Sequence, residues 1–395
     1  MRSRDIPVEV HKSHGLAGEW VQPDWPPLTL PEVDGLLRQY PLAGGAVRIL
    51  SHSPRPFSAA SVVETPRGPV FVKRHGHQVR NWASLMEEHR LIAHLAAQLP
   101  NLVQEPLADR DGQTVVCSRD WSDADWTYEV HPLATGIDLY EDALSWTPFR
   151  STGHALAAGL AMARLHRAAG SYDAAAREPR QLISSYSIFA SGDPEKSLAS
   201  YLEMRPLLRD YAERRDWRAS MNELLIPFYE RLSPWLGHLR PLWTHNDLHA
   251  SNLTWSGADA DAKVTGIIDF GLADRTNAVH DLATAIERNM VEWLRIEDPE
   301  ADVLHLDHVD ALLAGYEELS PLSYEEARAL PAMLPLVHCE FALSETDYFL
   351  SVVGSPEKAS LAYEGYFLGH AEWFLTDQGR RLLDHLEERA ERHRR

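Results

Sequence analysis

Cysteine is scarce in this sequence, with only Cys117 and Cys339 among 395 residues. The two cysteines form no CxxC pair, which excludes a disulfide-stapled scaffold and the usual cysteine spacings of zinc sites. This scarcity fits a reducing compartment, although one bridge between the two stays open. The chain also lacks a run of about 18 uninterrupted apolar residues, and its start, MRSRDIPVEVHKSHG, has no apolar signal segment. We therefore expect a cytoplasmic protein without a membrane-spanning segment.

Basic residues are fewer than acidic ones: the chain has 38 Lys and Arg but 58 Asp and Glu, which gives a formal charge of −20. This balance argues against nucleic acid or an anionic membrane as the main partner, since both are bound by basic surfaces. An acidic surface favours solubility in general and could also favour a cationic small molecule. With 44% apolar residues, the chain can bury a sizeable core in two or three domains.

The first half of the chain predicts a small β-rich lobe that follows an extension. Residues 1–40 are rich in Pro and Trp, and we expect one short helix in them, from Pro31 to Tyr40. Strand-like runs and one helical pattern, from Val79 to Leu99, fill residues 41–131, the predicted N-terminal lobe. The strand-like runs are AVRILSH, AASVVETPRG, PVFVKRH, QTVVCSRDW and WTYEVHPLA.

The second half, residues 132–395, is predicted to be a larger and mostly helical C-terminal lobe. It opens with the Ala/Leu-rich helix TGHALAAGLAMARLHRAAG, closed by Gly170, and helical patterns continue to the end. Only residues 241–272 interrupt them, as a strand–loop–strand region. Together the two halves predict an α+β fold class with two lobes.

The strand–loop–strand region contains the motif HNDLHASN, followed by the apolar strand IIDFG. Asp247 and Asn252 have the spacing D-x-x-x-x-N, and Asp269 ends the second strand. Phosphoryl transfer needs a base to orient the acceptor hydroxyl and oxygen ligands for Mg²⁺ beside the phosphates. Asp247 suits the first role, whereas Asn252 and Asp269 suit the second.

A kinase also needs a cation on the phosphates of ATP, and the N-terminal lobe offers one in Lys73 of VFVK. The helical pattern that follows places Glu88 on the same face as Leu91, Ile92 and Leu95. Glu87 would be the more exposed of the two glutamates. We therefore choose Glu88 as the ion-pair partner of Lys73.

These motifs resemble those of the aminoglycoside phosphotransferase and choline kinase superfamily, small-molecule kinases with a protein-kinase-like fold. The resemblance covers roughly residues 40–350 and is most specific in HNDLHASN and GIIDFGLAD; MARLH with His166 and HDLATAI with Asp281 are further landmarks. It implies an ATP- and Mg²⁺-dependent enzyme that phosphorylates a hydroxyl of a small molecule. It also implies that residues 41–131 form a nucleotide-binding lobe and residues 132–395 a catalytic and acceptor-binding lobe. Asp281 is expected to cap a helix or to brace the catalytic loop rather than to act in catalysis.

The predicted phosphate-covering loop, SHSPRPFSAAS, departs from the protein-kinase pattern because it contains no glycine. Serines such as Ser53 and Ser58 could donate hydrogen bonds there instead. The preference for ATP or GTP therefore stays open, and so does the oligomeric state.

The acceptor is the least determined part of this interpretation. His249 could serve loop packing or the acceptor pocket, and HCEFALSETDYF puts Glu340, Ser344 and Asp347 on one helical face. In the family this chain resembles, the acceptor lies against C-terminal helices, so Glu340 and Asp347 could bind an amine or could form a solvated face only. An amino alcohol, a hydroxylated amino acid or an aminoglycoside-like compound is the expected substrate.

Two alternatives belong to other classes. A metal-dependent hydrolase could use His245, Asp247 and His249, which would share a face on a strand. A catalytically silent kinase-like binding protein would be expected to lack one of Lys73, Asp247, Asn252 and Asp269, yet all four are present. Tryptophans such as Trp82, Trp121, Trp243 and Trp255 are expected to anchor the core or a lobe interface.

Overall fold

The computed structural model describes residues 23–53, 55–119, 125–143, 146–298 and 300–394. The chain forms two compact units. The smaller unit extends to Ile137 and includes Thr265–Ile268, and the larger unit comprises Asp138–Val264 and Asp269–Arg395. The first 22 residues of the predicted extension, and Trp121, lie outside the described residues.

The smaller unit is built on an antiparallel sheet with the strand order β1-β2-β3-β5-β4. Its strands coincide with the five strand-like runs of the sequence. They are β1 (Arg48–His52), β2 (Ala59–Thr65), β3 (Gly68–Gly76), β4 (Val115–Arg119) and β5 (Asp125–Pro132). The register pairs Lys73 on β3 with Glu129 on β5, so both side chains point to the same face of the sheet.

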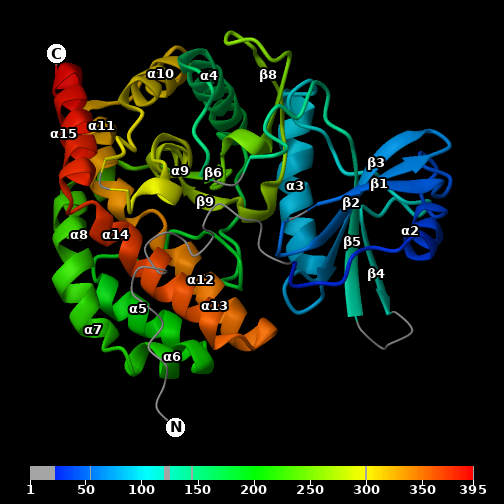
Figure 1. Ribbon diagram of the computed structural model, residues 1–395, viewed down its shortest axis with the longest axis horizontal. Coiled ribbons are helices and arrows are strands. Elements are labelled where there is room, and N and C mark those ends of the chain that lie inside the picture. The colour runs from blue at the N-terminus through cyan, green and yellow to red at the C-terminus, as the bar shows by residue number, and fades with distance from the viewer. Residues whose placement is uncertain (1–22, 54, 120–124, 144–145, 299, 395) are drawn as a thin grey trace. The chain divides into compact units, whose positions relative to one another are not determined.

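Helix α2 (Leu30–Leu37) covers one face of this sheet (Figure 1). It begins with a capping box between Thr29 and Glu32, an arrangement that satisfies the free N–H groups of a helix start. Its Val33, Leu36 and Leu37 join the core formed by β-strand residues; that core also contains Val63, Val70, Val72, Trp126, Tyr128 and Val130. The short helix of the predicted extension is therefore present and belongs to the core of the smaller unit.

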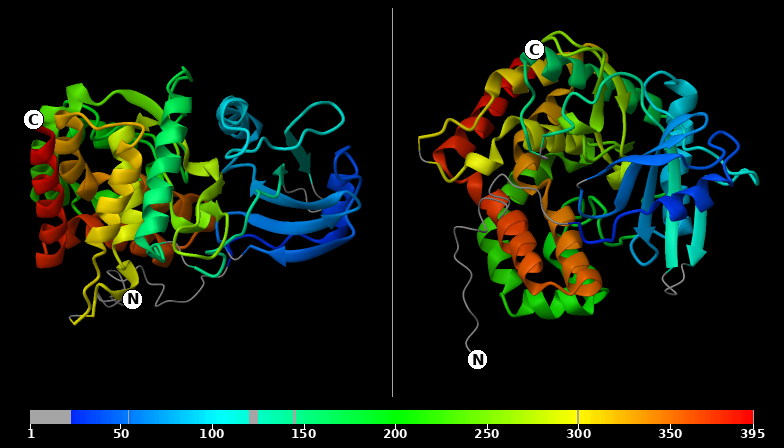
Figure 2. Two further views of the ribbon diagram at one scale, coloured as in Figure 1. Left: turned by 90° about the horizontal axis from the view of Figure 1, so that it is seen from above. Right: turned by 45° about the vertical axis from the view of Figure 1, so that its right-hand side comes forward.

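Helix α3 (Trp82–Gln98) lies along the opposite face of the sheet, as Figure 2 shows. The side chain of Asn81 accepts a hydrogen bond from the Ser84 N–H and caps its start. Glu88 is buried on the inward face, as the helical pattern predicted. The prediction for Trp82 is wrong, because this side chain is 43% exposed: it occupies the first position of α3, on the outward side.

The larger unit is mostly helical, as predicted, which confirms the α+β class (Figure 1). Its helices are α4 (Thr152–Ala169), α5 (Pro194–Glu203), α6 (Pro206–Glu213), α7 (Trp217–Ser220), α8 (Ile226–Leu232), α9 (Ala278–Met290), α10 (Leu306–Glu317), α11 (Tyr324–Met333), α12 (Cys339–Tyr348), α13 (Pro356–Ser360), α14 (Gly369–Trp373) and α15 (Asp377–Glu391). Its short strands are β6 (Pro241–Thr244), β7 (Leu253–Trp255) and β9 (Asp274–Asn277), whereas β8 (Val264–Ile267) lies mostly in the segment Thr265–Ile268 of the smaller unit. Trp243 and Trp255 are buried, as expected.

Helices α4 and α10 pack side by side with almost no space between their backbones (Figure 1). A Cβ atom on Gly159 of α4 would lie 1.9 Å from the Leu312 carbonyl oxygen of α10. The contact is reciprocal, because a Cβ on Gly315 of α10 would lie 2.1 Å from the Leu156 carbonyl oxygen of α4. Two glycines therefore set the separation of these helices.

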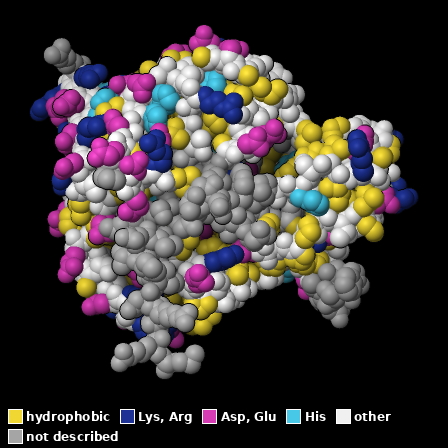
Figure 3. Space-filling view, in the orientation of Figure 1, with side chains coloured by type: hydrophobic (Ala, Val, Ile, Leu, Met, Phe, Trp, Pro, Cys, Tyr) yellow, Lys and Arg dark blue, Asp and Glu magenta, His cyan; other side chains and the backbone are white. Residues whose placement is uncertain are grey.

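The surface carries the acidic excess of the sequence. On the face of the larger unit shown in Figure 3, Asp and Glu side chains are scattered among Lys and Arg rather than gathered in one patch. No helix among the described residues is long and apolar enough to cross a membrane. Both cysteines are free thiols, Cys117 exposed and Cys339 buried.

Candidate active site

The predicted catalytic loop, His245–Asn252, follows β6 in the larger unit and reverses direction at Asn246. This residue has φ 59°, a left-handed conformation that asparagine tolerates better than most side chains. Its Oδ1 accepts hydrogen bonds from the hydroxyls of Thr244 (2.8 Å) and Thr276 (3.1 Å), and its Nδ2 donates to the Leu272 carbonyl at 3.2 Å. Asn246 thus ties the catalytic loop to the turn that follows Asp269.

Asp247 and Asn252 are held together by the loop itself. The Asn252 Nδ2 donates to the Asp247 backbone carbonyl at 2.9 Å and to the Asp247 Oδ2 at 3.3 Å. Because its amide nitrogen is committed in this way, Asn252 has Oδ1 left as a ligand atom for a cation. The Asp247 side chain keeps 18% exposure.

Asp269 begins the turn of the Asp-Phe-Gly motif with φ 59°, and its side chain is exposed. The turn is anchored on both sides. Phe270 packs against the ring of His245, with ring centroids 4.8 Å apart, and the Arg177 Nη1 donates to the carbonyl oxygens of Gly271 and Ala273, both at 3.0 Å. Asp269 is therefore an exposed residue on a backbone that these contacts hold in place.

Helix α9 braces the catalytic loop through Asp281; β6, β9 and α9 lie side by side in the larger unit (Figure 1). The fully buried carboxylate of Asp281 accepts the backbone N–H groups of His245 (3.1 Å) and Asn246 (2.7 Å) and contacts the His166 Nε2 at 2.9 Å. Burial opposes the charged form, yet hydrogen bonding and charge from His166 hold the pKa of Asp281 below its ordinary value. Asp281 braces the loop, which is one of the two roles predicted for it.

Two further residues of α9 reach the same loop and were missed by the sequence analysis. The Asn289 Nδ2 donates to the Leu248 carbonyl, and its Oδ1 accepts the Ala250 N–H, both at 2.9 Å. The buried Arg288 places Nη2 3.3 Å from the Asp247 Oδ1 and stacks its guanidinium 4.6 Å from the ring centre of Trp146. Asp281, Arg288 and Asn289 are spaced i, i+7 and i+8, so the helical period of HDLATAIERN could have identified them.

Comparison with known proteins identifies the family of this chain. A model of the phosphotransferase enzyme family matches residues 57–322, more than half of the chain. The chain belongs to this family. The resemblance found in the sequence is confirmed, and the protein is a phosphotransferase. No curated protein matches its sequence closely enough to count as a relative.

Two solved structures share the fold of this phosphotransferase. A microcompartment-associated aminopropanol kinase is 18% identical with a TM-score of 0.57, and the match covers 89% of this chain and 99% of that one. An amicoumacin kinase, solved with AMP-PNP, Ca²⁺ and Ami, is 13% identical with a TM-score of 0.50, over 87% and 88% of the two chains. At these identities the likeness establishes the kinase-like fold.

In the smaller unit of the phosphotransferase, the predicted nucleotide contacts lie on three elements. Lys73 is on β3 and Glu88 is buried on α3. Ser53 lies in the turn after β1, where its N–H donates to the Ala60 carbonyl at 2.8 Å, and Ser58 is buried just before β2. Their roles toward a nucleotide stay predictions. The register also puts Glu129 opposite Lys73, a neighbour that the sequence analysis did not consider.

Of the possible acceptor residues, Glu340 and Asp347 lie on α12 and are buried with internal partners. Glu340 accepts hydrogen bonds from the N–H groups of Ser187 (2.7 Å) and Ile188 (2.6 Å) and from two serine hydroxyls. Asp347 accepts a hydrogen bond from the Gln181 Nε2 at 2.8 Å. These contacts fix the loop before α5, and a contact of either carboxylate with an acceptor stays a prediction.

His249 lies inside the catalytic loop. Its Nδ1 hydrogen-bonds with the Ser251 hydroxyl at 2.8 Å, and its Nε2 is 3.7 Å from the Asp247 Oδ2. His245 is fully buried and its Nδ1 accepts the Asp247 N–H at 3.3 Å. His245, Asp247 and His249 form no group of converging metal ligands in the described part of the chain, which, together with the family, sets the hydrolase alternative aside.

Proposed function

We propose that this phosphotransferase moves the γ-phosphoryl group of ATP to a hydroxyl of a small molecule that carries an amine, with Mg²⁺ as the metal ion. The observation that carries this proposal is the catalytic loop itself. Asp247 and Asn252 are joined by a hydrogen bond. Asn246 connects the catalytic loop to the turn that follows Asp269, and Asp281 of α9 accepts a hydrogen bond from the backbone of the loop.

The roles follow from the chemistry of each side chain and from its position in the loop or the turn. Asp247 orients the acceptor hydroxyl and accepts its hydrogen; contacts from Asn252 and Arg288 to its two carboxylate oxygens, both at 3.3 Å, fix the plane of the group. Asn252 Oδ1 and the exposed carboxylate of Asp269 are hard oxygen ligands of the kind that Mg²⁺ prefers. When bound, the ion neutralises charge on the phosphates.

The smaller unit supplies the phosphate contacts in this proposal. Lys73, ion-paired with Glu88, contacts the α- and β-phosphates, and Ser53 and Ser58 donate to the phosphates in place of a glycine-rich loop. Positioning and electrostatic stabilisation then provide most of the rate enhancement. GTP stays an alternative donor.

For the acceptor, we favour an amino alcohol over a hydroxylated amino acid or an aminoglycoside-like compound. The formal charge of −20 suits a cationic substrate, and the aminopropanol kinase that shares the fold acts, by its name, on an amino alcohol.

The experiment is a screen for ADP release with ATP and Mg²⁺. The panel contains amino alcohols, hydroxylated amino acids, aminoglycosides and, as a matched set, sugars without an amine. We expect turnover with amine-bearing acceptors in the wild type and a loss of at least 100-fold in Asp247→Asn, in line with removal of a general base. Turnover with the amine-free sugars alone would contradict the acceptor class, and turnover that survives in Asp247→Asn would contradict the role of Asp247.

A further inference from the structure

A second cluster of ionisable side chains, separate from the candidate active site, lies in the smaller unit on the face of the sheet that α3 covers. Here His75 of β3, His89 of α3 and His131 of β5 surround the carboxylate of Glu129, also on β5. We call these four residues the His₃Glu cluster. Glu129 is 1% exposed and His89 is 4% exposed, so the cluster is an interior feature.

All three histidines point the same ring nitrogen at one carboxylate. The Nε2 atoms of His89 and His131 each lie 2.9 Å from the Glu129 Oε2, and the Nε2 of His75 lies 2.9 Å from the Oε1. The rings of His89 and His131 are perpendicular, with centroids 6.0 Å apart. His89, His131 and Glu129 thus bring three ligand atoms within 4.8 Å of one another.

Both ring nitrogens of His89 have a polar neighbour. Its Nδ1 lies 2.8 Å from the Thr114 Oγ1, which also lies 3.7 Å from the Met86 Sδ. The tautomer that donates its Nδ1 hydrogen to Thr114 leaves the Nε2 lone pair, on the side of Glu129, as a ligand atom for a metal ion.

We propose that the His₃Glu cluster binds one transition-metal ion of the zinc class through His89 Nε2, His131 Nε2 and Glu129 Oε2. Two imidazoles and a carboxylate form a ligand set known for Zn²⁺, with a fourth position left for water. His75 and Thr114 act from outside this set: His75 contacts the second carboxylate oxygen and Thr114 contacts the His89 Nδ1, as outer partners of metal ligands commonly do.

Distances and access agree with this assignment. Ligand atoms around tetrahedral zinc are separated by roughly 3.3 Å, given bonds of about 2 Å, so contacts of 2.9 Å need to open by only a few tenths of an ångström. The side chain of His131 is 23% exposed and provides an entry path.

Lys73 and Arg80 are cations whose charge acts on His75 of the cluster, with the same sign as that of a metal ion. Because Lys73 pairs with Glu129 in the sheet register, metal at the cluster would link β3, α3 and β5 next to the proposed phosphate contact.

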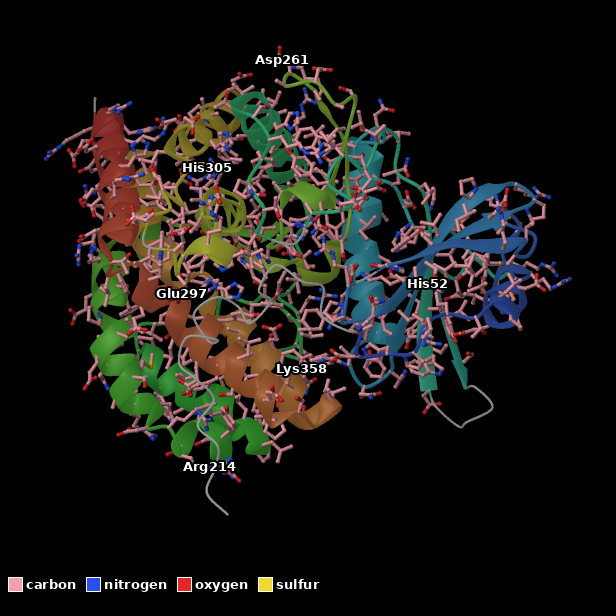
Figure 4. All side chains as sticks on the ribbon, in the orientation of Figure 1. His52, Arg214, Asp261, Glu297, His305 and Lys358 are labelled. Carbon is pink, nitrogen blue, oxygen red and sulfur yellow. The ribbon has the colours of Figure 1, made fainter. Side chains whose placement is uncertain are left out.

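Two other groups of histidines and carboxylates are weaker candidates. Glu287, His338 and His370 of the larger unit are fully buried, but the Arg288 Nε already lies 3.7 Å from the Glu287 Oε2 and opposes a cation. His305, Asp307 and His308 stand at the start of α10, where Figure 4 labels His305, and are only partly buried. These groups provide controls.

The test uses the full-length, tag-free protein after chelator treatment, titrated with Co²⁺ and then with Zn²⁺ in the absence of nucleotide and Mg²⁺. We expect one equivalent of Co²⁺ with the strong visible absorption of a four-coordinate site, displaced by Zn²⁺. His89→Gln and Glu129→Gln should each weaken binding at least tenfold. His94→Gln, on the same helix, and His305→Gln should leave it unchanged.

Thermal melting of each variant checks that it folds, and His131→Gln, at the half-exposed ligand, replaces any variant that does not. Absence of stoichiometric binding in the wild type would overturn the proposal and leave the cluster as three imidazoles hydrogen-bonded to one carboxylate. Binding that persists in His89→Gln and in His131→Gln but disappears in His305→Gln would also overturn it, because the ion would then occupy α10. Neither of these two outcomes would contradict the proposed binding of ATP, because the titration contains no nucleotide.

Discussion

Asn246 and Asp269 hold a left-handed backbone at the two ends of the candidate active site, each with φ 59°. Left-handed conformations cost about 1–2 kcal/mol for ordinary L-residues, and asparagine and aspartate visit them more readily than others. Such strain persists where surrounding contacts enforce it. At Asn246 these contacts are the hydrogen bonds of its side-chain amide with Thr244, Thr276 and Leu272. They explain why a residue other than glycine can occupy this position.

Substitutions at Asn246 separate the stability cost of the left-handed backbone from the contribution of these side-chain hydrogen bonds. Asn246→Gly removes the hydrogen bonds but adopts the left-handed backbone without strain. Asn246→Ala removes the same hydrogen bonds and adds the steric cost of a Cβ atom in that conformation. We expect Ala to lower the free energy of unfolding by about 1 kcal/mol more than Gly, and kcat to fall in both. Urea unfolding of the wild type and both variants measures this difference. Equal stability of the Ala and Gly variants would show that the backbone conformation is not costly.

Glu287 is a buried carboxyl of the larger unit whose titration should change the stability of the protein with pH. Burial raises its pKa to about 7 from the ordinary 4.5, opposed by the charge of the neighbouring Arg288 and by the Trp146 indole N–H. The nearby His370 is kept neutral, because burial and Arg288 lower its pKa well below the ordinary value, and His338 also faces the carboxyl.

Because the folded state holds its proton to higher pH than the unfolded state, Glu287 stabilises the protein at low pH. This contribution declines as the pH rises from 4.5 to about 7, and its size is roughly 3 kcal/mol. Glu287→Gln should therefore flatten the dependence of stability on pH in this window. The measurement is the unfolding midpoint of both proteins at several pH values from 5 to 8; parallel curves would refute the assignment.

At the scale of elements, α9 and the α4–α10 pair position the catalytic loop. Helix α4 carries His166 and α10 carries Tyr316; the His166 ring contacts the Tyr316 hydroxyl at 2.9 Å and Asp281 at 2.9 Å. The separation of α4 and α10 depends on Gly159 and Gly315. A change in helix separation should consequently reach the catalytic loop through His166.

Gly159→Ala tests this packing. Its Cβ would lie 1.9 Å from the Leu312 carbonyl oxygen, so the helices must separate, and we expect a loss of about 3 kcal/mol or more in stability, at the upper end of overpacking costs. The matched control is Gly35→Ala in α2, where no atom lies within 4 Å of the added Cβ; it should stabilise by about 0.5–1 kcal/mol. Thermal unfolding of both variants gives the comparison, and a Gly159→Ala protein as stable as the control would contradict the packing argument.

At the scale of the whole molecule, the sequence predicted what local patterns encode. The strands around VFVK, the D-x-x-x-x-N loop and the helix containing Glu88 all depend on residues close in the chain, and each lies where it was expected. Helix α2 was predicted as a helix but assigned to an extension, because the strands that bury it come later in the sequence.

Contacts between distant segments could not be predicted from the same patterns. Arg288 contacts Asp247, from which it is 41 residues away in the sequence, and His75 contacts Glu129, from which it is 54 residues away. A buried arginine beside a catalytic carboxylate, and a carboxylate shared by three histidines, become visible only when sheet register and helix packing are known. Helical spacing along α9 was the one sequence signal for the first of these, and no periodic pattern marked the second.

The central claim, a nucleotide site whose metal ligand is Asp269 and whose base is Asp247, is tested most directly by thermal unfolding with and without ATP plus Mg²⁺. The proteins are the wild type, Asp269→Asn and Asp247→Asn. We predict that ATP plus Mg²⁺ raises the Tm of the wild type and of Asp247→Asn, since the base is not needed for binding, and that Asp269→Asn loses most of the rise. No rise in the wild type with either ATP or GTP, or an equal rise in Asp269→Asn, would contradict the claim.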